Sequence, residues 1–189
     1  MGLRTGILFC MERTTKYLSK ELFVVVIHGP MGAGKTVLAD MLHDEITDTA
    51  HFGADHIKRL VSDFRNVPSH TQVAQNMVPI MADGYLKQRI NLILEQAFTT
   101  EEIKSLELIA QKYDAKFYVY GLDADREILN ERIVERTKRL EKPEVSMDHI
   151  NKSYNEYIRQ KYDGGVLFDT NKISPREMAD KILTDLDLI

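Results

Sequence analysis

Short apolar runs alternate along the chain with longer segments in which hydrophobic residues recur at helical spacing. The short runs predict five strands, at residues 22–27, 51–52, 91–94, 116–120 and 166–168. The segments between these runs are long enough to form helices. Strands separated by helices are typical of βαβ units, so we expect a three-layer α/β fold in which helices cover both faces of a five-stranded parallel sheet.

Helix start signals and one helix breaker refine this expectation. We expect helices over residues 37–46, 57–64, 71–89, 99–113, 125–140 and 146–161, and a terminal helix that begins at Ser174. Thr99 with Glu102 matches the capping-box pattern, and so does Ser174 with Glu177. Pro79 predicts a kink or a break in its helix because proline cannot donate the backbone hydrogen bond.

Composition narrows the class of protein without naming a reaction. A chain of 189 residues fits one domain, and we assign residues 1–20 to an N-terminal extension and residues 21–189 to that domain. The net charge of −4 and the 43% hydrophobic content exclude a disordered chain and a protein that binds nucleic acid through bulk positive charge. The longest apolar run, residues 22–27, is far shorter than the roughly 20 residues of a membrane-spanning helix. The single cysteine, Cys10, fits a reducing compartment, so we expect a cytoplasmic protein.

The most specific motif lies between a predicted strand and a predicted helix. It matches G-x-x-x-x-G-K-[ST], and its residues are Gly29, Pro30, Met31, Gly32, Ala33, Gly34, Lys35 and Thr36. Glycines allow successive backbone N–H groups to face a phosphate chain, and the helix that follows adds its positive N-terminal dipole. Lys35 can reach the β- and γ-phosphates, and the Thr36 hydroxyl can ligate Mg²⁺. The motif therefore predicts a nucleoside triphosphate and Mg²⁺ as ligands.

Other positions separate the classes of phosphate-loop protein. A GTPase would show N-K-x-D, but Asn171 and Lys172 are not followed by the required aspartate. A motor ATPase places paired acids after an apolar strand, whereas here Glu95 stands alone. A small-molecule kinase needs a carboxylate for the acceptor hydroxyl, cations for the migrating phosphoryl group, and a lid. Asp55 supplies the carboxylate, and Arg132, Arg136 and Arg139 share one face of a helix that leads into a lid at about residues 132–147.

These motifs together resemble a known family. The phosphate loop, residues 54–59 (ADHIKR), residues 91–95 (NLILE), residues 117–120 (FYVY) with R-x-x-x-R, and residues 166–171 (VLFDTN) look like P-loop kinases of the zeta-toxin, polynucleotide-kinase and chloramphenicol-phosphotransferase group. The resemblance covers about residues 22–187. It implies the P-loop NTPase fold, with strand order 2-3-1-4-5, and a helical lid.

The resemblance also implies roles for individual residues. It implies that Lys35 and Thr36 hold the phosphates and Mg²⁺, and that Asp55 faces the acceptor hydroxyl. Glu95 would lie near the metal's water shell or the substrate, and the loop around Asn171 near the adenine. The arginines expected to clamp the phosphates are Arg132 and Arg136.

This chain departs from the family pattern on the substrate side. Members often show Asp-Asp-x-Arg where this sequence has Asp55, His56, Ile57 and Lys58, so the substrate-side cation is Lys58 or Arg59. This departure weakens any inference that this chain acts on the same substrate as a particular member of the family.

Several alternatives remain open at this point. Asp55 could instead cap the helix that follows it, because aspartate is a preferred N-cap residue. The arginines could belong to a solvated helix face. His51, Asp55 and His56 match no structural zinc spacing, so we expect no metal cluster there.

We therefore expect an ATP-dependent, Mg²⁺-dependent kinase that phosphorylates a hydroxyl of a small-molecule acceptor. One alternative is a kinase for polynucleotide 5′-hydroxyls. The net charge and the lack of a basic patch with interleaved aromatic residues count against it. The other alternative is a regulatory protein that binds ATP without transferring phosphate.

Overall fold

The five strands form one parallel sheet. The computed structural model describes residues 16–62, 69–140 and 145–189. Its strands are β1 (Phe23–His28), β2 (Thr49–Phe52), β3 (Asn91–Gln96), β4 (Lys116–Asp123) and β5 (Val166–Asp169). They lie in the order β2-β3-β1-β4-β5 with every pair parallel, which confirms the predicted order.

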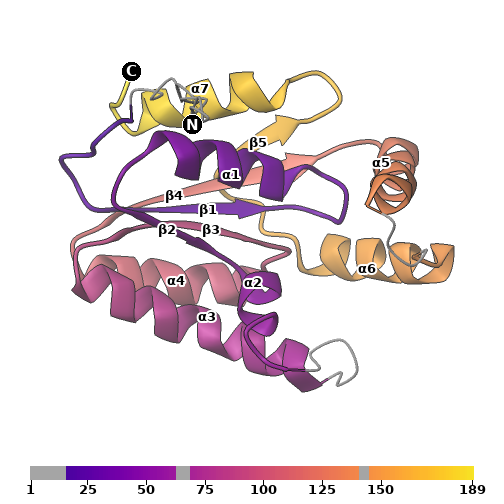
Figure 1. The fold of residues 1–189 in the computed structure, drawn as a ribbon, viewed down its shortest axis with the longest axis horizontal. Coiled ribbons are helices and arrows are strands. Elements are labelled where there is room, and N and C mark those ends of the chain that lie inside the picture. Colours follow the sequence, from indigo (N-terminus) through magenta and orange to yellow (C-terminus); the bar gives the residue numbers. More distant parts are fainter. Residues whose placement is uncertain (1–15, 63–68, 141–144) are drawn as a thin grey trace, which may run out of the picture.

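Helices cover both faces of the sheet, as Figure 1 shows. The helices in the described part of the chain are α1 (Lys35–Glu45), α2 (Ala54–Lys58), α3 (Ser69–Lys87), α4 (Thr100–Lys112), α5 (Arg126–Arg139), α6 (Met147–Gln160) and α7 (Pro175–Asp185). Helices α1 and α7 pack together on one face, and α3 and α4 pack together on the other. Helices α2, α5 and α6 lie toward the carboxyl ends of the strands. The three-layer α/β architecture is therefore confirmed.

The central strand β1 explains why both faces are covered. Phe23, Val25 and Ile27 are buried in a core that includes α1 and α7. The alternating residues Val24 and Val26 are buried in a second core that includes α3 and α4. Successive side chains of a strand point to opposite faces, so a continuous apolar run requires a helical layer on each side.

Both predicted capping boxes are confirmed. The Thr99 side chain accepts a hydrogen bond from the Glu102 N–H, and the Glu102 side chain accepts one from the Thr99 N–H. Ser174 and Glu177 form the same reciprocal pair at the start of α7. These pairs satisfy N–H groups that the first turn of a helix leaves unpaired.

One predicted helix is shorter in the structure, and one predicted breaker does not end its helix. The stripe at Ile57, Leu60 and Val61 predicted a helix over residues 57–64, but α2 ends at Lys58 and Leu60 is 78% exposed. Only Ile57 of these three is buried, and Phe64 lies outside the described residues. Pro79 lies inside α3 without ending it. Tertiary packing of the helix on the sheet outweighs the missing backbone donor there.

The start of the described chain is attached to the domain. Tyr17 donates its backbone N–H to the Glu45 carbonyl at 2.7 Å and accepts one from the Thr47 N–H at 2.8 Å. The expected domain boundary at residue 20 stays a prediction. Among the residues that the structure describes, no helix combines the length and hydropathy needed to cross a membrane.

The turn from β2 into α2 depends on a glycine. A Cβ at Gly53 would lie 1.9 Å from the Glu95 carbonyl oxygen, although its φ is ordinary. We predict that Gly53→Ala lowers the free energy of unfolding by about 1–3 kcal/mol because the two strand ends must separate. Gly84→Ala in α3 is the matched control, since nothing lies within 4 Å of its Cβ position.

Urea unfolding of both variants checks this prediction. Gly84→Ala should be unchanged or gain up to about 1 kcal/mol, because alanine is the better helix former. Equal stability of Gly53→Ala and wild type would contradict the close approach of Gly53 to β3.

Candidate active site

The phosphate loop leaves β1 and enters α1 with the backbone geometry that its glycines allow. Gly32 and Gly34 have φ values of 85° and 96°, which side-chain-bearing residues rarely adopt. The Lys35 ammonium donates a hydrogen bond to the Pro30 carbonyl at 3.0 Å, so the lysine lies across its own loop. Gly34 is the N-cap of α1, so the positive end of that helix dipole faces the loop.

Glu95 lies beside this loop at the carboxyl end of β3. Its side chain is only 8% exposed, and its Oε1 accepts a hydrogen bond from the Thr36 hydroxyl at 3.1 Å. Burial raises the pKa of Glu95, while Lys35 and the Thr36 hydrogen bond oppose that rise. Burial likewise lowers the pKa of Lys35, while Glu95 and Asp55 oppose that fall. The two charged groups therefore compensate each other in a poorly solvated place.

Asp55 lies in the first turn of α2, directly after β2. Its carboxylate is 79% exposed and lies 3.4 Å from the Lys58 ammonium. The N-cap residue of α2 is Gly53, so the alternative in which Asp55 caps this helix is wrong. The Ala54 N–H donates to Gln96 Oε1 at 3.0 Å, which fixes the start of α2 to the end of β3. Asp55 is thereby held near Glu95.

A cavity of about 730 Å³ joins the phosphate loop to α5 and to the loop after β5. Its lining contains residues 32–37 together with Arg132, Arg136, Lys138 and Arg139. All three arginines predicted from the sequence thus face the same space as the phosphate loop. A cavity that joins so many cations to a nest of backbone N–H groups is suited to a polyanion.

Arg132 already has partners in this structure. Its guanidinium donates to the Thr170 hydroxyl at 2.9 Å and to the Thr170 carbonyl at 2.8 Å. Arg132 thus ties α5 to the loop after β5, while Arg136 lines the cavity and lowers the pKa of Lys35.

The remaining predicted residues lie at the margins of the site. Asn171 is exposed, and its backbone N–H donates to Asp169, while its neighbours Thr170 and Ile173 line the cavity. Arg59 is the exposed C-cap residue of α2. The predicted lid at 132–147 includes the second half of α5, and its residues 141–144 lie outside the described chain.

His28, the last residue of β1, is a further residue of this site that was not among those predicted from the sequence. It is buried directly before the phosphate loop, and its Nδ1 lies 3.3 Å from the Tyr157 hydroxyl of α6. Burial, with Lys161 and Lys35 nearby, lowers the pKa of His28 to about 4. A polar residue that ends an otherwise apolar strand was the available signal. Its neutral ring links α6 to the base of the phosphate loop.

Comparisons with known proteins identify a family and several similar folds. The model of the family described as "AAA domain" matches residues 24–159. No curated protein matches the chain. Among solved structures, a Chloroflexus aurantiacus protein described as a "putative kinase" is 18% identical, with a TM-score of 0.70 over 88% of this chain and 97% of that one.

Two further structures extend the comparison. A gluconokinase from Sinorhizobium meliloti is 13% identical, with a TM-score of 0.61 over 87% of this chain and 91% of that one. A structure of the PezAT toxin–antitoxin system of Streptococcus pneumoniae is 14% identical, with a TM-score of 0.59 over 90% and 89% of the two chains. These similarities confirm the predicted P-loop kinase fold and its likeness to the zeta-toxin group.

The buried charge of Glu95 predicts a stability effect. Its pKa is raised in the folded protein, so ionising it destabilises the fold at pH values above its ordinary pKa of 4.5. We predict that Glu95→Gln raises the melting temperature at neutral pH, because the amide keeps the shape and removes the charge.

The pH dependence supplies the control. The difference in melting temperature between Glu95→Gln and wild type should vanish below about pH 4 and grow as the pH rises through the folded-state pKa. Glu101→Gln, which changes an exposed glutamate in the first turn of α4, is the matched variant and should show no such gain. A melting temperature of Glu95→Gln below that of wild type at pH 7 would contradict the raised pKa of Glu95 in the folded protein.

Proposed function

The chain belongs to this AAA-domain family, and we propose that it is a kinase that transfers the γ-phosphoryl group of ATP to a hydroxyl of a small-molecule acceptor. One observation carries the proposal. A phosphate loop with Lys35, a buried carboxylate bonded to Thr36, and an exposed carboxylate at Asp55 meet at the carboxyl ends of the neighbouring strands β2, β3 and β1. In open parallel sheets, ligands bind at this edge.

The phosphate side of the reaction is assigned to the cation-rich cavity. Backbone N–H groups of the loop and the Lys35 ammonium would bind the triphosphate, and Arg136 would neutralise charge on the migrating group. Arg132 holds the loop at Thr170 and would reach the phosphates by exchanging that partner.

Thr36 and Glu95 fit the requirements of Mg²⁺. A hydroxyl and a carboxylate are the hard oxygen donors that this ion prefers. Because the Thr36 hydroxyl donates its proton to Glu95, its lone pairs remain available to a cation. When bound, Mg²⁺ would neutralise charge on the β- and γ-phosphate oxygens. Glu95 would orient Thr36 and accept hydrogen bonds from the metal's water ligands.

Asp55 is assigned to the acceptor. Its carboxylate is exposed, lies beside the Lys58 ammonium, and belongs to the same electrostatic neighbourhood as Lys35 and Glu95. It would orient the acceptor hydroxyl and accept its proton as the new O–P bond forms. Lys58 would contact an anionic or polar acceptor. The gluconokinase among the similar structures supports a small acceptor.

Two substitutions separate binding from transfer. Lys35→Ala should lose nearly all turnover because the charge that stabilises the migrating phosphoryl group is gone. Asp55→Asn should bind ATP with unchanged affinity and transfer phosphate about 10²–10⁴-fold more slowly, since the amide cannot accept the proton. Asp44→Asn, an exposed change on α1, is the matched control and should behave as wild type.

Transfer is measured with γ-labelled ATP and a panel of gluconate, other polyols, nucleosides and 5′-hydroxyl oligonucleotides, with products identified by mass spectrometry. Wild-type turnover by Asp55→Asn would contradict the role of Asp55. If only the oligonucleotide is phosphorylated, the acceptor is a nucleic acid and not a small molecule. Tight ATP binding with no phosphorylated product would favour a regulatory nucleotide-binding protein.

A further inference from the structure

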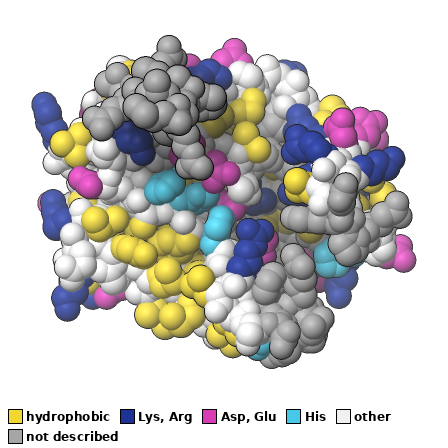
Figure 2. Space-filling model, viewed as in Figure 1, with side chains coloured by type: hydrophobic (Ala, Val, Ile, Leu, Met, Phe, Trp, Pro, Cys, Tyr) yellow, Lys and Arg dark blue, Asp and Glu magenta, His cyan; other side chains and the backbone are white. Residues whose placement is uncertain are grey.

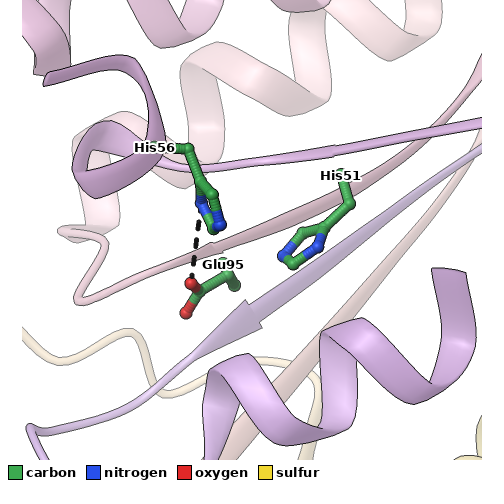
Figure 3. A group of neighbouring side chains, drawn as sticks. All are labelled: His51, His56 and Glu95. Carbon is green, nitrogen blue, oxygen red and sulfur yellow. Dashed lines mark ion pairs between the residues drawn. The ribbon is translucent and has the colours of Figure 1, made fainter. Parts of the chain in front are cut away.

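His51, His56 and Glu95 converge beside the phosphate loop, and the transfer mechanism uses only the glutamate. His51 belongs to β2 and His56 to α2, and Figure 3 shows both rings close to the carboxylate of Glu95 on β3. One ring nitrogen of each histidine and one carboxylate oxygen lie within 4.8 Å of one another. The His56 Nδ1 is 3.9 Å from Glu95 Oε1, too far for a hydrogen bond.

In the described part of the chain, each histidine of this cluster has one buried ring nitrogen that lacks a hydrogen-bond partner. Within the described part of the chain, His51 Nε2 and His56 Nδ1 have neither solvent contact nor a hydrogen-bond partner. The His51 side chain is 6% exposed. A buried polar atom without a partner lowers the stability of the fold. Two such atoms that face one carboxylate therefore indicate a site for a bound group that bonds to both of them.

Asp40 orients the His51 ring in the way that metal sites require. The His51 Nδ1 lies 3.3 Å from the Asp40 carboxylate on α1, which favours the proton on Nδ1. The lone pair is then on Nε2, the buried atom without a partner. A carboxylate behind the non-ligating nitrogen is the usual support of a histidine that binds a metal.

A cavity beside the two histidines gives access to the cluster. It has a volume of about 360 Å³, is lined by both histidines, and opens between β2, α2 and α3. In Figure 2, histidine side chains reach the surface of this face beside a hydrophobic patch.

We propose that His51, His56 and Glu95 form a binding site for a transition-metal dication of the Zn²⁺ type, and that its occupation inhibits phosphoryl transfer. Two imidazoles and a carboxylate suit Zn²⁺ and its neighbours rather than Mg²⁺, which prefers oxygen ligands only. Three protein ligands leave a fourth position for water. Donors of a tetrahedral zinc site lie about 3.3 Å apart, so both rings must rotate toward the carboxylate on binding.

The inhibitory effect follows from a shared atom and rests on the proposed function. Glu95 Oε1 is the oxygen that faces His56, and it is also the oxygen that accepts the Thr36 hydroxyl. A metal ion that takes this oxygen removes the acceptor that orients Thr36 toward Mg²⁺. It also places a second dication close to the Mg²⁺ position, where like charges repel.

Metal binding is tested without nucleotide. The untagged full chain carries Cys10→Ser, which removes its only thiol, and is titrated with Co²⁺ while the visible d–d absorption is followed. We expect one Co²⁺ per chain with the intense absorption of low coordination, displaced by Zn²⁺. His51→Gln and His56→Gln should each weaken binding at least about tenfold, and Asp40→Asn about tenfold.

His149→Gln, an exposed histidine on α6, is the matched control and should bind as wild type. Circular dichroism and melting temperature verify that each variant folds. Absence of Co²⁺ binding by the wild-type fold, or unchanged binding by both His51→Gln and His56→Gln, overturns the site.

Inhibition is tested separately in the transfer assay at fixed Mg²⁺. Zn²⁺ should reduce wild-type turnover at least about tenfold, and His51→Gln should keep its basal turnover in the presence of Zn²⁺. Unchanged or increased wild-type turnover with the site loaded overturns inhibition and leaves the metal site standing. If no acceptor is phosphorylated under any condition, the proposed function fails, whereas the Co²⁺ titration still decides the site.

Discussion

The arrangement of this site depends on a carboxylate that is buried where β3 ends. Glu95 accepts a hydrogen bond from the Thr36 hydroxyl and feels the charge of Lys35, in a place where burial disfavours its own charge. The parallel sheet imposes this position, because β3 lies between β2 and β1 and their carboxyl ends meet at one edge. Gly53 allows the end of β2 to approach the Glu95 carbonyl, and Gln96 fixes α2 to β3. The buried charge therefore organises both sides of the site.

The electrostatics divide the site into two regions. On the phosphate side, the loop backbone and the arginines of α5 surround a cavity that favours negative charge. On the other side, the exposed carboxylate of Asp55 and the cluster of His51 and His56 lie around the same Glu95. The Glu95 carboxylate thus accepts the Thr36 hydroxyl and faces two imidazoles, each of which has one ring nitrogen without a hydrogen-bond partner among the described residues. Competition for a single oxygen is a direct physical route from metal binding to control of phosphoryl transfer.

The sheet and the phosphate loop were predictable because their signals are local. An apolar run with a helix on each face defines β1, and the motif through Lys35 and Thr36 encodes its own turn. The positions of Glu95 and Asp55 were predictable because residues at the carboxyl ends of parallel strands lie at the same edge of a sheet. The end of α2 at Lys58 was not predictable, since the apolar residues Leu60 and Val61 beyond it are exposed rather than packed in a core.

Contacts between distant segments could not be predicted from the sequence either. Arg132 bonds to Thr170, and His28 contacts Tyr157, through side-chain positions that only the packed structure fixes. The histidine spacing alone gave no metal pattern, because the third donor comes from another strand.

The proposed roles of Lys35, Thr36, Glu95 and Asp55 can be checked together in a crystal structure with Mg²⁺ and a non-hydrolysable ATP analogue. We expect the triphosphate to lie in the loop with its γ-phosphate beside Lys35. The Thr36 hydroxyl should ligate Mg²⁺, Glu95 should bond to the metal's waters, and Asp55 should face the open side of the γ-phosphate. A γ-phosphate separated from Asp55 by protein, or a Mg²⁺ ion bound away from Thr36, would contradict these roles.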